Sequence, residues 1–553
     1  MVAGLDKESL DTVLVSLREF AHRELGDRAL LAWDREDKVP LDIVRRMYGD
    51  ELGIQLLFVP SEYSGMGGST FDVYRVCEAM ARVDLGVATS VLATFLGSDP
   101  ISVGGTPEQK ARWLTRIAEE GALFAYGATE PSAGSDLGAL KTTATRVEEG
   151  GVVKGYRLNG SKQWISNGAI ADLYTILAAT PAGPTWFVVD KGTPGFSAGR
   201  QEEKHGIRLS NTAPLTLEDV YVEADRRVGG VEGQGLAQAV AVFGYTRVMV
   251  ASFGLGGGWA ALDRAIPYSA QRVQAGGPLS EKQGYTHKLI VPHAAALEAG
   301  RSLIEETADL IDAADGMQGQ YNTEGAIAKY MCSEAGNAAA EAAIQALGGY
   351  GYTHEYMVEK YKRDVRITTI YEGTSEILEM TIGRDRWQVH LKTRGAHYPD
   401  KARELDALHA KNPAVGADLA ANALRALGAF LERCRVGRLT RHQHVLLRMG
   451  ELVAQAECAG AFARRAARAA DGSANPKTDA RFSPDTLAAL SRVFARGALM
   501  KVAAGGAQWA AAAPGASGEA ALGAGLDAAV RAQAGLIEDM DRVADAIYER
   551  ART

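Results

Sequence analysis

Apolar residues recur at helical spacing through the first part of the chain. Leu10, Leu14 and Leu17 lie three or four positions apart, which places them on one face of a helix. The pair Thr106-Pro107 is suited to a helix start, since threonine caps the N-terminus of a helix and proline fits its first position. The pattern predicts an N-terminal helical domain over residues 1–120.

From residue 121 to residue 230 the apolar period changes to one typical of strands. Short runs rich in β-branched and aromatic residues, such as Leu173–Leu177, are separated by residues that form turns. Two of the separators are Asn159-Gly160 and Asn167-Gly168, and Asn-Gly between such runs is the strongest local signal for a hairpin. The sequence therefore predicts a middle β-domain over residues 121–230.

Helical spacing returns at Gly235 and continues to the end of the chain. We expect one helical domain over residues 231–390 and a further one over residues 391–553. Breaks at 471–476 and 514–518 suggest about three helices in the second of these. The segment Gly254-Leu-Gly-Gly-Gly258 resembles a fragment of a dinucleotide-binding fingerprint, but it lies within a helical pattern and therefore favours helix packing.

Composition narrows the class of protein. With 553 residues the chain is too long for a single core, and its net charge of -8 argues against binding to nucleic-acid phosphates. The four cysteines form no close pair, so we expect neither a disulfide scaffold nor a thiolate zinc site, and a reducing compartment is favoured. We see no targeting leader and no run near 18 apolar residues, which predicts a cytoplasmic protein without a membrane-spanning helix.

Three polar blocks carry the candidate chemistry. They read Tyr126-Gly-Ala-Thr-Glu-Pro-Ser-Ala-Gly-Ser-Asp136, Asn159-Gly-Ser-Lys-Gln-Trp-Ile-Ser-Asn-Gly168 and Ile370-Tyr-Glu-Gly-Thr-Ser-Glu-Ile377. Taken alone, the first block could be an ordinary connector and Trp164 an aromatic residue of a β-core. In this order, and in a helix–strand–helix frame, the three blocks resemble the acyl-CoA dehydrogenase family over about residues 5–390.

The resemblance implies both a fold and a cofactor. The fold would be α+β and mostly α, with an N-terminal helical domain, a middle β-barrel-like domain, a C-terminal four-helix bundle and an additional C-terminal helical domain. The cofactor would be FAD, with its isoalloxazine ring held by residues of the first two blocks: Tyr126, Ala128, Thr129, Trp164, Ile165 and Ser166. Ser135 is also expected in the cofactor site, at the thioester and pantetheine end of the substrate. An indole against one face of the ring would supply stacking area, and hydroxyl and backbone donors would stabilise the charge that develops on reduction.

The resemblance makes Glu372 the expected catalytic base. In the family this glutamate lies beside the α-carbon of the substrate, and an apolar pocket would raise its pKa toward the working pH. An exposed glutamate at a helix start is the alternative. Some relatives carry the base on an earlier helix, but the matching residue here is Thr246, which cannot act as one. Residues expected on the substrate side are Ser135, Thr246, Arg247 and Gly373, with a solvated arginine as the alternative for Arg247.

In the family the remaining half of FAD is held across a dimer interface. The matching residues are Arg272, Gln283, Gln345, Gly348, Gly349, Thr374 and Glu376, which implies a homodimer or a higher assembly. The chain departs from the family at Ala275, where relatives have a phenylalanine near the adenine. The implied partners are an acyl-CoA substrate and an electron-transferring flavoprotein.

The segment 391–553 is similar in length and helical character to the extra domain of very-long-chain acyl-CoA dehydrogenases. Positive charges at Arg433, Arg435, Arg438, Arg441 and Arg448 accompany the apolar residues Leu431, Val445, Leu446 and Leu447. One interpretation is a peripheral contact with an anionic membrane surface. A solvated or subunit-facing helix is the interpretation that we favour.

The function implied by the resemblance is FAD-dependent α,β-dehydrogenation of an acyl-CoA to a trans-2-enoyl-CoA. Glu372 would take the α-proton and N5 of the flavin would take the β-hydride. One rival keeps the fold but lets the reduced flavin react with oxygen, as in an oxidase or a monooxygenase. A second rival is a homologue without activity that serves as a scaffold.

Overall fold

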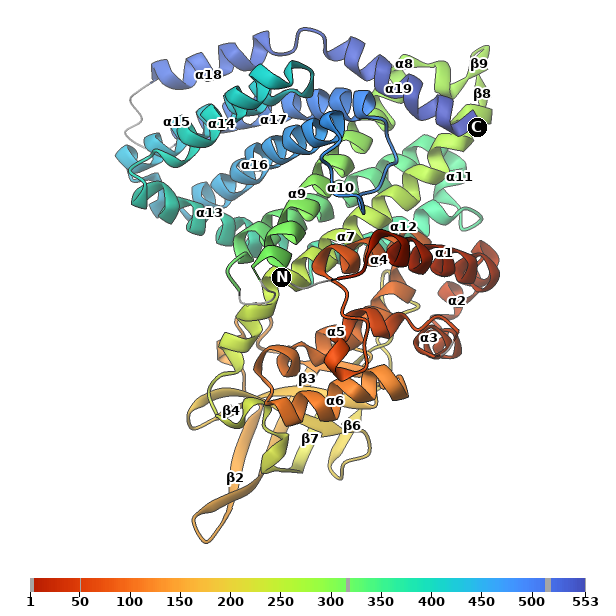
Figure 1. Cartoon of the computed structure of the whole chain (residues 1–553), viewed down its shortest axis with the longest axis vertical. Coiled ribbons are helices and arrows are strands. Elements are labelled where there is room, and N and C mark those ends of the chain that lie inside the picture. Colours follow the sequence, from red (N-terminus) through yellow and green to blue (C-terminus); the bar gives the residue numbers. More distant parts are fainter. Residues whose placement is uncertain (1–3, 50, 315–318, 513–518, 553) are drawn as a thin grey trace. The chain divides into compact units, whose positions relative to one another are not determined.

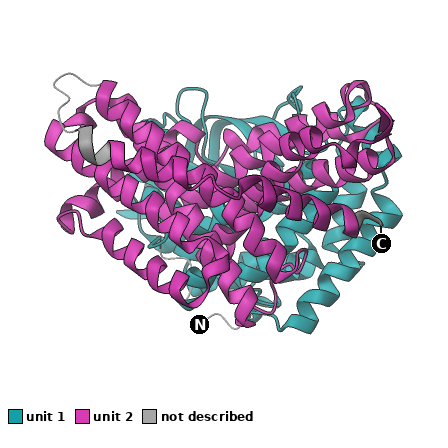
Figure 2. Cartoon of the chain, turned by 90° about the horizontal axis from the view of Figure 1, so that it is seen from above, with its two compact units in different colours: residues 1–249, 308–322 teal, residues 250–307, 323–553 magenta. Residues whose placement is uncertain are grey.

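The computed structural model describes residues 4–49, 51–314, 319–512 and 519–552. They form two compact units, shown in separate colours in Figure 2. Unit 1 comprises residues 1–249 and 308–322, and unit 2 comprises residues 250–307 and 323–553. The expected α+β fold, mostly α, is confirmed, whereas the division into four sequence domains stays a prediction.

Unit 1 begins with helices, as the apolar pattern predicts. They are α1 (Lys7–Glu24), α2 (Asp27–Glu36), α3 (Leu41–Tyr48), α4 (Thr70–Val83), α5 (Leu85–Gly104) and α6 (Pro107–Glu120). Leu10, Leu14 and Leu17 are buried on one face of α1. The hydroxyl of Thr106 accepts the N–H of Gln109, so Thr106 caps α6 as expected.

A curled sheet follows these helices, and α5 packs against it (Figure 1). The strands are β1 (Phe124–Gly127), β2 (Thr143–Glu149), β3 (Val152–Ser166), β4 (Leu173–Thr180), β5 (Gly183–Asp190), β6 (Phe196–Ala198) and β7 (Thr212–Glu223). Their order is β1-β4-β2-β3-β7-β6, with β5 paired to β4. β1 pairs with β4 in parallel, so the start of the first polar block, Tyr126 and Gly127, is fixed to a buried strand.

The hairpin expected at Asn159-Gly160 is wrong, because both residues lie inside the long strand β3. The register between β3 and β7 shifts at this point, as in a β-bulge. A Cβ on Gly160 would lie 2.5 Å from Oγ1 of Thr142, so glycine permits a close approach here. The turn between β2 and β3 is instead formed by Gly150 and Gly151, both with positive φ.

The remaining elements before residue 392 are mainly helical. They are α7 (Gly235–Gln271), β8 (Val273–Gln274), β9 (Gly277–Pro278), α8 (Gln283–Leu289), α9 (Val291–Ala313), α10 (Asn322–Leu347), α11 (Gly349–Tyr352), α12 (Met357–Val365) and α13 (Ser375–Lys392). By length and composition α7 could cross a membrane, but 78% of its most apolar window is buried within the protein. Helix α7 is therefore best described as a core helix.

Glycines let α7 and α10 pack in backbone contact within unit 2. A Cβ on Gly254 would lie 2.6 Å from the carbonyl oxygen of Cys332, and one on Gly336 would lie 2.1 Å from the carbonyl oxygen of Gly254. No larger residue fits at either position without moving a helix. The glycine-rich segment of α7 is thus a packing face, as expected, and it fixes α10 in place.

The extension contains six helices within its described residues, rather than about three. They are α14 (His397–Lys411), α15 (Ala417–Gly437), α16 (Gln443–Asp471), α17 (Pro484–Ala512), α18 (Glu519–Arg531) and α19 (Leu536–Arg552). Helix α16 ends at Asp471 as predicted, and the break expected at 514–518 lies outside the described residues. The pattern missed the short connections at 412–416 and 438–442, which interrupt the apolar period for only a few residues.

Helix α16 packs directly on α13 (Figure 1). A Cβ on Gly450 would lie 1.9 Å from the carbonyl oxygen of Glu379, so the two helices are in backbone contact. Leu431 and Val445, two of the apolar residues considered for a membrane contact, are buried. Arg448 forms an ion pair with Glu379 at 2.7 Å. These residues therefore serve the packing of the extension.

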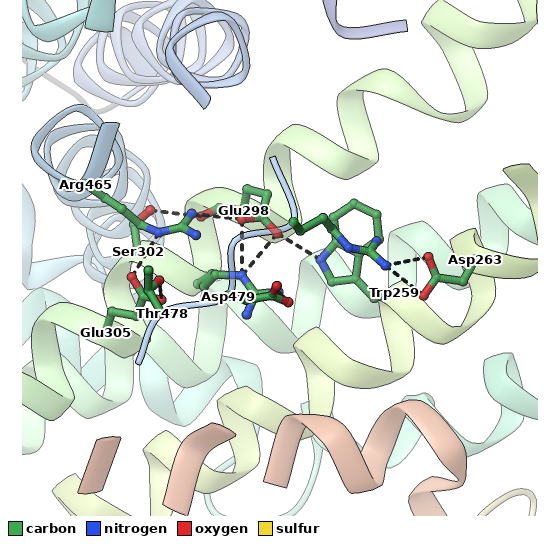
Figure 3. A network of polar contacts seen from close by, with 10 residues as sticks. Trp259, Asp263, Glu298, Ser302, Glu305, Arg465, Thr478 and Asp479 are labelled. Atoms are coloured by element: carbon green, nitrogen blue, oxygen red, sulfur yellow. Dashed lines mark hydrogen bonds and ion pairs between the residues drawn. The ribbon is translucent and has the colours of Figure 1, made fainter. Parts of the chain in front are cut away.

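A buried network of charges joins α9 to α16 and to the segment after α16 (Figure 3). Glu298 accepts hydrogen bonds from Trp259 Nε1 at 3.1 Å and from Arg465 at 2.8 Å. It also pairs with Arg301 at 3.1 Å, while Arg465 pairs with Glu305 at 2.9 Å. The side chains of Glu298, Arg301, Glu305 and Arg465 are all at least 95% buried.

Candidate active site

The first two polar blocks lie side by side in unit 1. The backbone N–H of Gln163 donates to the carbonyl of Thr129 at 2.9 Å. The ammonium of Lys162 donates to the carbonyl of Ala128 at 3.2 Å. The loop after β1 is thus joined to the end of β3, so the first two blocks are neighbours in unit 1, and their contact with a flavin ring stays a prediction.

A buried ion pair lies beneath this junction. Lys162 and Glu130 are 2.8 Å apart, with side-chain exposures of 0% and 3%. The carboxylate of Glu130 also accepts the N–H groups of Lys141 at 2.6 Å and Thr142 at 2.9 Å. Burial alone would favour a neutral acid, but these donors outweigh it and lower the pKa of Glu130 to about 2.

Sequence reasoning assigned no role to Glu130 or Lys162, although both lie inside the quoted blocks. The signal that could have found them is a lysine in a strand whose neighbours Leu158 and Ile165 are buried. Charged residues are almost never fully buried unless they are paired. A lysine in the second block and a glutamate in the first could therefore have been expected to form an ion pair, once the two blocks were placed together.

Replacing Lys162 by methionine is expected to destabilise unit 1 by about 3–5 kcal/mol, because Glu130 would stay buried without its partner. Lys154→Met is a matched control, since Lys154 is exposed on the same strand, and we expect its effect to stay within about 0.5 kcal/mol. Urea denaturation of both variants measures the difference. Limited proteolysis should show faster cleavage within residues 131–141 in Lys162→Met but not in Lys154→Met. Equal urea midpoints for the two variants would contradict a stabilising role of the Lys162–Glu130 pair.

Trp164 offers an open aromatic face. Its side chain is 61% exposed, which is unusual for an indole, and its φ of +58° lies in the left-handed region. Such a conformation costs about 1–3 kcal/mol and is typical of functional sites. The neighbouring Ile165 is buried, so it can contact a ligand only through its backbone, whereas the hydroxyl-bearing Ser166 is half-buried.

The other residues expected near the ring differ in accessibility. Tyr126 is half-buried and its ring centroid lies 4.7 Å from that of Trp186. Ala128 is buried, Thr129 is half-buried and Ser135 is exposed on the loop. The hydroxyls of Thr129 and Ser135 are thus accessible to a ligand, together with the loop backbone.

Thr246 and Arg247, expected on the substrate side, are buried in α7. The guanidinium of Arg247 lies 4.9 Å from the ring centroid of Phe243 and donates to the carbonyl of Asn322 at 3.4 Å. Arg247 is only 7% exposed, which excludes the alternative of a solvated arginine. A contact of either residue with substrate stays a prediction.

Glu372 lies in unit 2, in the turn that precedes α13. The residue is half-buried, its φ is +55°, and the φ of Gly373 is +96°. A left-handed glutamate carries a backbone cost of about 1–2 kcal/mol, so the surrounding contacts must hold it there. The ammonium of Lys329, on α10, donates to the carbonyl of Gly373 at 2.6 Å. Sequence reasoning missed Lys329.

Thr374 and Glu376 form the start of α13. The hydroxyl of Thr374 accepts the N–H of Ile377 and so caps the helix. The pKa of Glu376 is lowered, first by its own backbone N–H and then by the hydroxyl of Thr374. Both residues therefore have a local role in ending the turn that carries Glu372, and their contact with a nucleotide stays a prediction.

The residues expected near the adenine half of FAD form a second group in unit 2. Tyr285 on α8 donates to the carbonyl of Ala346 on α10 at 3.0 Å, so the segment with Gln283 lies beside the one with Gln345. Gln283, Gln345, Gly348, Gly349 and Arg272 are all exposed. Gln283 also donates to Asp541 of the extension at 3.0 Å.

Gly348 and Gly349 present bare backbone at the end of α10. Gly348 has φ +60° and ψ -133°, a combination open essentially to glycine alone, and an added Cβ at either residue would meet no atom within 4 Å. Backbone of this kind suits a close approach by a phosphate. Unit 2 thus carries two separate candidate groups, the Glu372 turn and the bare backbone of Gly348 and Gly349, and unit 1 carries one, the exposed indole of Trp164 with the first block.

The chain is similar to known proteins over most of its length. Three family profiles match, described as the acyl-CoA dehydrogenase N-terminal domain at residues 7–121, the middle domain at 125–220 and the C-terminal domain at 233–386. An acyl-CoA dehydrogenase of Bacillus subtilis (strain 168) is 36% identical over 375 residues, covering 66% of this chain and 95% of that protein. A short-chain-specific acyl-CoA dehydrogenase of Megasphaera elsdenii is 38% identical over 342 residues, covering 60% and 86%.

One solved structure matches the chain including its extension. It is the crystal structure of an acyl-CoA dehydrogenase from Bacillus anthracis complexed with FAD, with a TM-score of 0.84 and 24% identity. The match covers 99% of this chain and 96% of that one. At this identity it shows a shared fold, and the shared fold includes the helices after residue 391.

Proposed function

Because the chain belongs to the acyl-CoA dehydrogenase family, we propose that it removes two hydrogens from an acyl-CoA thioester and releases a trans-2-enoyl-CoA. The observation that carries the proposal is Glu372, a half-buried carboxylate held in a left-handed turn before α13. A base must be placed precisely to take a weakly acidic proton, and a strained, braced turn provides such placement.

FAD is the cofactor that these residues fit. The exposed face of Trp164 offers stacking area for a tricyclic ring, and Thr129 and Ser166 offer hydroxyl groups at its polar edge. The bare backbone of Gly348 and Gly349 suits the pyrophosphate. FAD, when bound, supplies the two-electron oxidant that takes a hydride from the β-carbon.

The residues of the chain supply the acid–base part of the reaction. The carboxylate of Glu372 takes the α-proton of the thioester. Its backbone N–H, as the family resemblance implies, donates to the thioester carbonyl and stabilises the negative charge that develops there. Half-burial of Glu372 limits its contact with water, which favours proton transfer from carbon over exchange with solvent.

We also propose a homodimer that passes electrons to an electron-transferring flavoprotein. The exposed positions of Gln345, Gly348 and Gly349 support the dimer, because a second chain could complete a nucleotide site there. The resemblance to the family supports the choice of an electron-transferring flavoprotein as the electron acceptor.

Anaerobic titration with butyryl-, octanoyl- and palmitoyl-CoA tests the proposed activity. We expect the visible flavin absorbance to be lost with at least one of them and an enoyl-CoA to be formed in equal amount. The chain length that acts fastest defines the substrate class. A purified protein without flavin, or a yellow protein that no acyl-CoA bleaches, would contradict the proposal.

The same preparation distinguishes the oxidase alternative. Turnover under air is compared with turnover on an artificial electron acceptor, and peroxide is measured in both. A dehydrogenase yields little peroxide per enoyl-CoA, whereas a yield near one per turnover would indicate an oxidase.

A further inference from the structure

The turn that carries Glu372 is held by one face of α10. Ser333 donates to the carbonyl of Thr368 at 2.9 Å, before the turn. Ser375, after the turn, donates to Glu334 at 2.5 Å. Lys329 lies one helical turn before Ser333 and donates to the carbonyl of Gly373, between these two contacts.

Lys329 is the buried charged member of this set. Its side chain is fully buried, and its 2.6 Å contact with Gly373 has the length of a charge-assisted hydrogen bond. Residues of this kind are rarely buried unless a specific contact requires them. The contact falls on the carbonyl directly after Glu372, where two consecutive residues have positive φ.

The helix that presents Lys329 is itself fixed. Gly336 of α10 and Gly254 of α7 are in backbone contact, so α10 cannot move toward or away from the turn without disturbing the core. The amide of Asn337 also donates to the carbonyl of Val365 at 3.0 Å. A lysine on such a helix holds the turn against a rigid element.

We propose that Lys329 is a positioning residue for catalysis: its ammonium anchors the Gly373 carbonyl and thereby fixes the direction of the Glu372 carboxylate. The inference rests on the proposed function, in which Glu372 is the base. Lys329 does not take part in proton transfer. Its effect is on geometry, and a misplacement of about 1 Å can slow a reaction by about 10²-fold.

The test compares Lys329→Met with wild type in single-turnover flavin reduction, using the acyl-CoA that bleaches the wild type fastest. We expect the rate constant per bound flavin to fall by about 10²-fold. Binding of the same acyl-CoA is measured by the flavin spectrum in the Glu372→Gln background, with and without Lys329→Met. We expect the two dissociation constants to agree within about threefold, because positioning affects the reaction more than ground-state binding.

Lys362→Met is the matched control. Lys362 also donates to a backbone carbonyl of α10, that of Asn337 at 3.2 Å, but away from the turn. Its rate should match wild type. Lys329→Arg, which keeps the charge and donors, should recover part of the lost rate.

Each result decides the inference. A wild-type rate per bound flavin in Lys329→Met overturns it, as does a loss confined to acyl-CoA binding. If Lys329→Met does not fold, Lys329→Gln takes its place under the same criteria. If Lys329→Gln does not fold either, Lys329→Arg decides: a partial loss of rate with unchanged acyl-CoA binding supports the inference, and a wild-type rate overturns it. A wild type that no acyl-CoA reduces would instead refute the proposed function.

Discussion

Glu372→Gln is expected to leave the protein folded and yellow while flavin reduction by acyl-CoA slows by about 10²–10⁴-fold. That range is the usual contribution of a general base. Glutamine has nearly the same shape as glutamate and imposes no new restriction on a residue with φ +55°, so the turn should persist. Its amide cannot accept a proton from carbon at working pH. The change therefore removes the chemical step and leaves the architecture intact.

Stopped-flow measurement of flavin absorbance after mixing with acyl-CoA gives the rate directly. Glu404→Gln is a suitable control, because Glu404 is an exposed residue of α14 and the same charge is removed. We expect the control to match wild type. Near-normal reduction by Glu372→Gln would place the base elsewhere and remove the main support for the proposed function.

Arg465→Met is expected to destabilise unit 2 by about 3–5 kcal/mol. Burial alone would raise the pKa of Glu298, but the charges of Arg301 and Arg465 outweigh it and keep the pKa below its ordinary value. Without Arg465, Glu298 and Glu305 would be buried with one cation fewer to balance them. Breaking a buried ion pair from one side carries a penalty of this size because the remaining charge stays desolvated.

The adjacent Arg464 provides the control. It pairs with Glu306 at 2.7 Å, also between α16 and α9, but both side chains are about one-third exposed. Arg464→Met should therefore lower stability by only about 0–1 kcal/mol. Urea denaturation followed by circular dichroism measures both variants. Equal losses of stability in Arg465→Met and Arg464→Met would mean that burial does not determine how much an ion pair contributes to the stability of unit 2.

The network bears on the role of the extension. Helix α16 supplies Arg465 to the buried charges of α9 and meets α13, which follows the Glu372 turn, in backbone contact at Gly450. The residues after 391 are thus packed into unit 2 rather than attached to it by a linker. We expect a chain truncated after α13 to expose Glu298 and the face of α13 that contacts Gly450, and so to be poorly soluble.

The sequence by itself determined the local structure and the candidate chemistry. Helical and strand periods and the cap at Thr106 depend on residues close together in the chain, whose backbone preferences can be judged locally. Local signals also have a limit. Asn159-Gly160 reads as a hairpin turn, but pairing with two neighbouring strands holds it within β3, because tertiary contacts override a local preference.

Only the tertiary structure decided which distant residues are partners. Lys162 meets Glu130 across 32 positions, and Lys329 meets Gly373 across 44. The chain contains many lysines and many carboxylates and carbonyls, and nothing in a local pattern selects one pair among them. The choice follows from the packing of whole elements, whose free energy is spread over many contacts. This packing buries Lys162 beside Glu130 in unit 1 and Lys329 beside the Glu372 turn in unit 2.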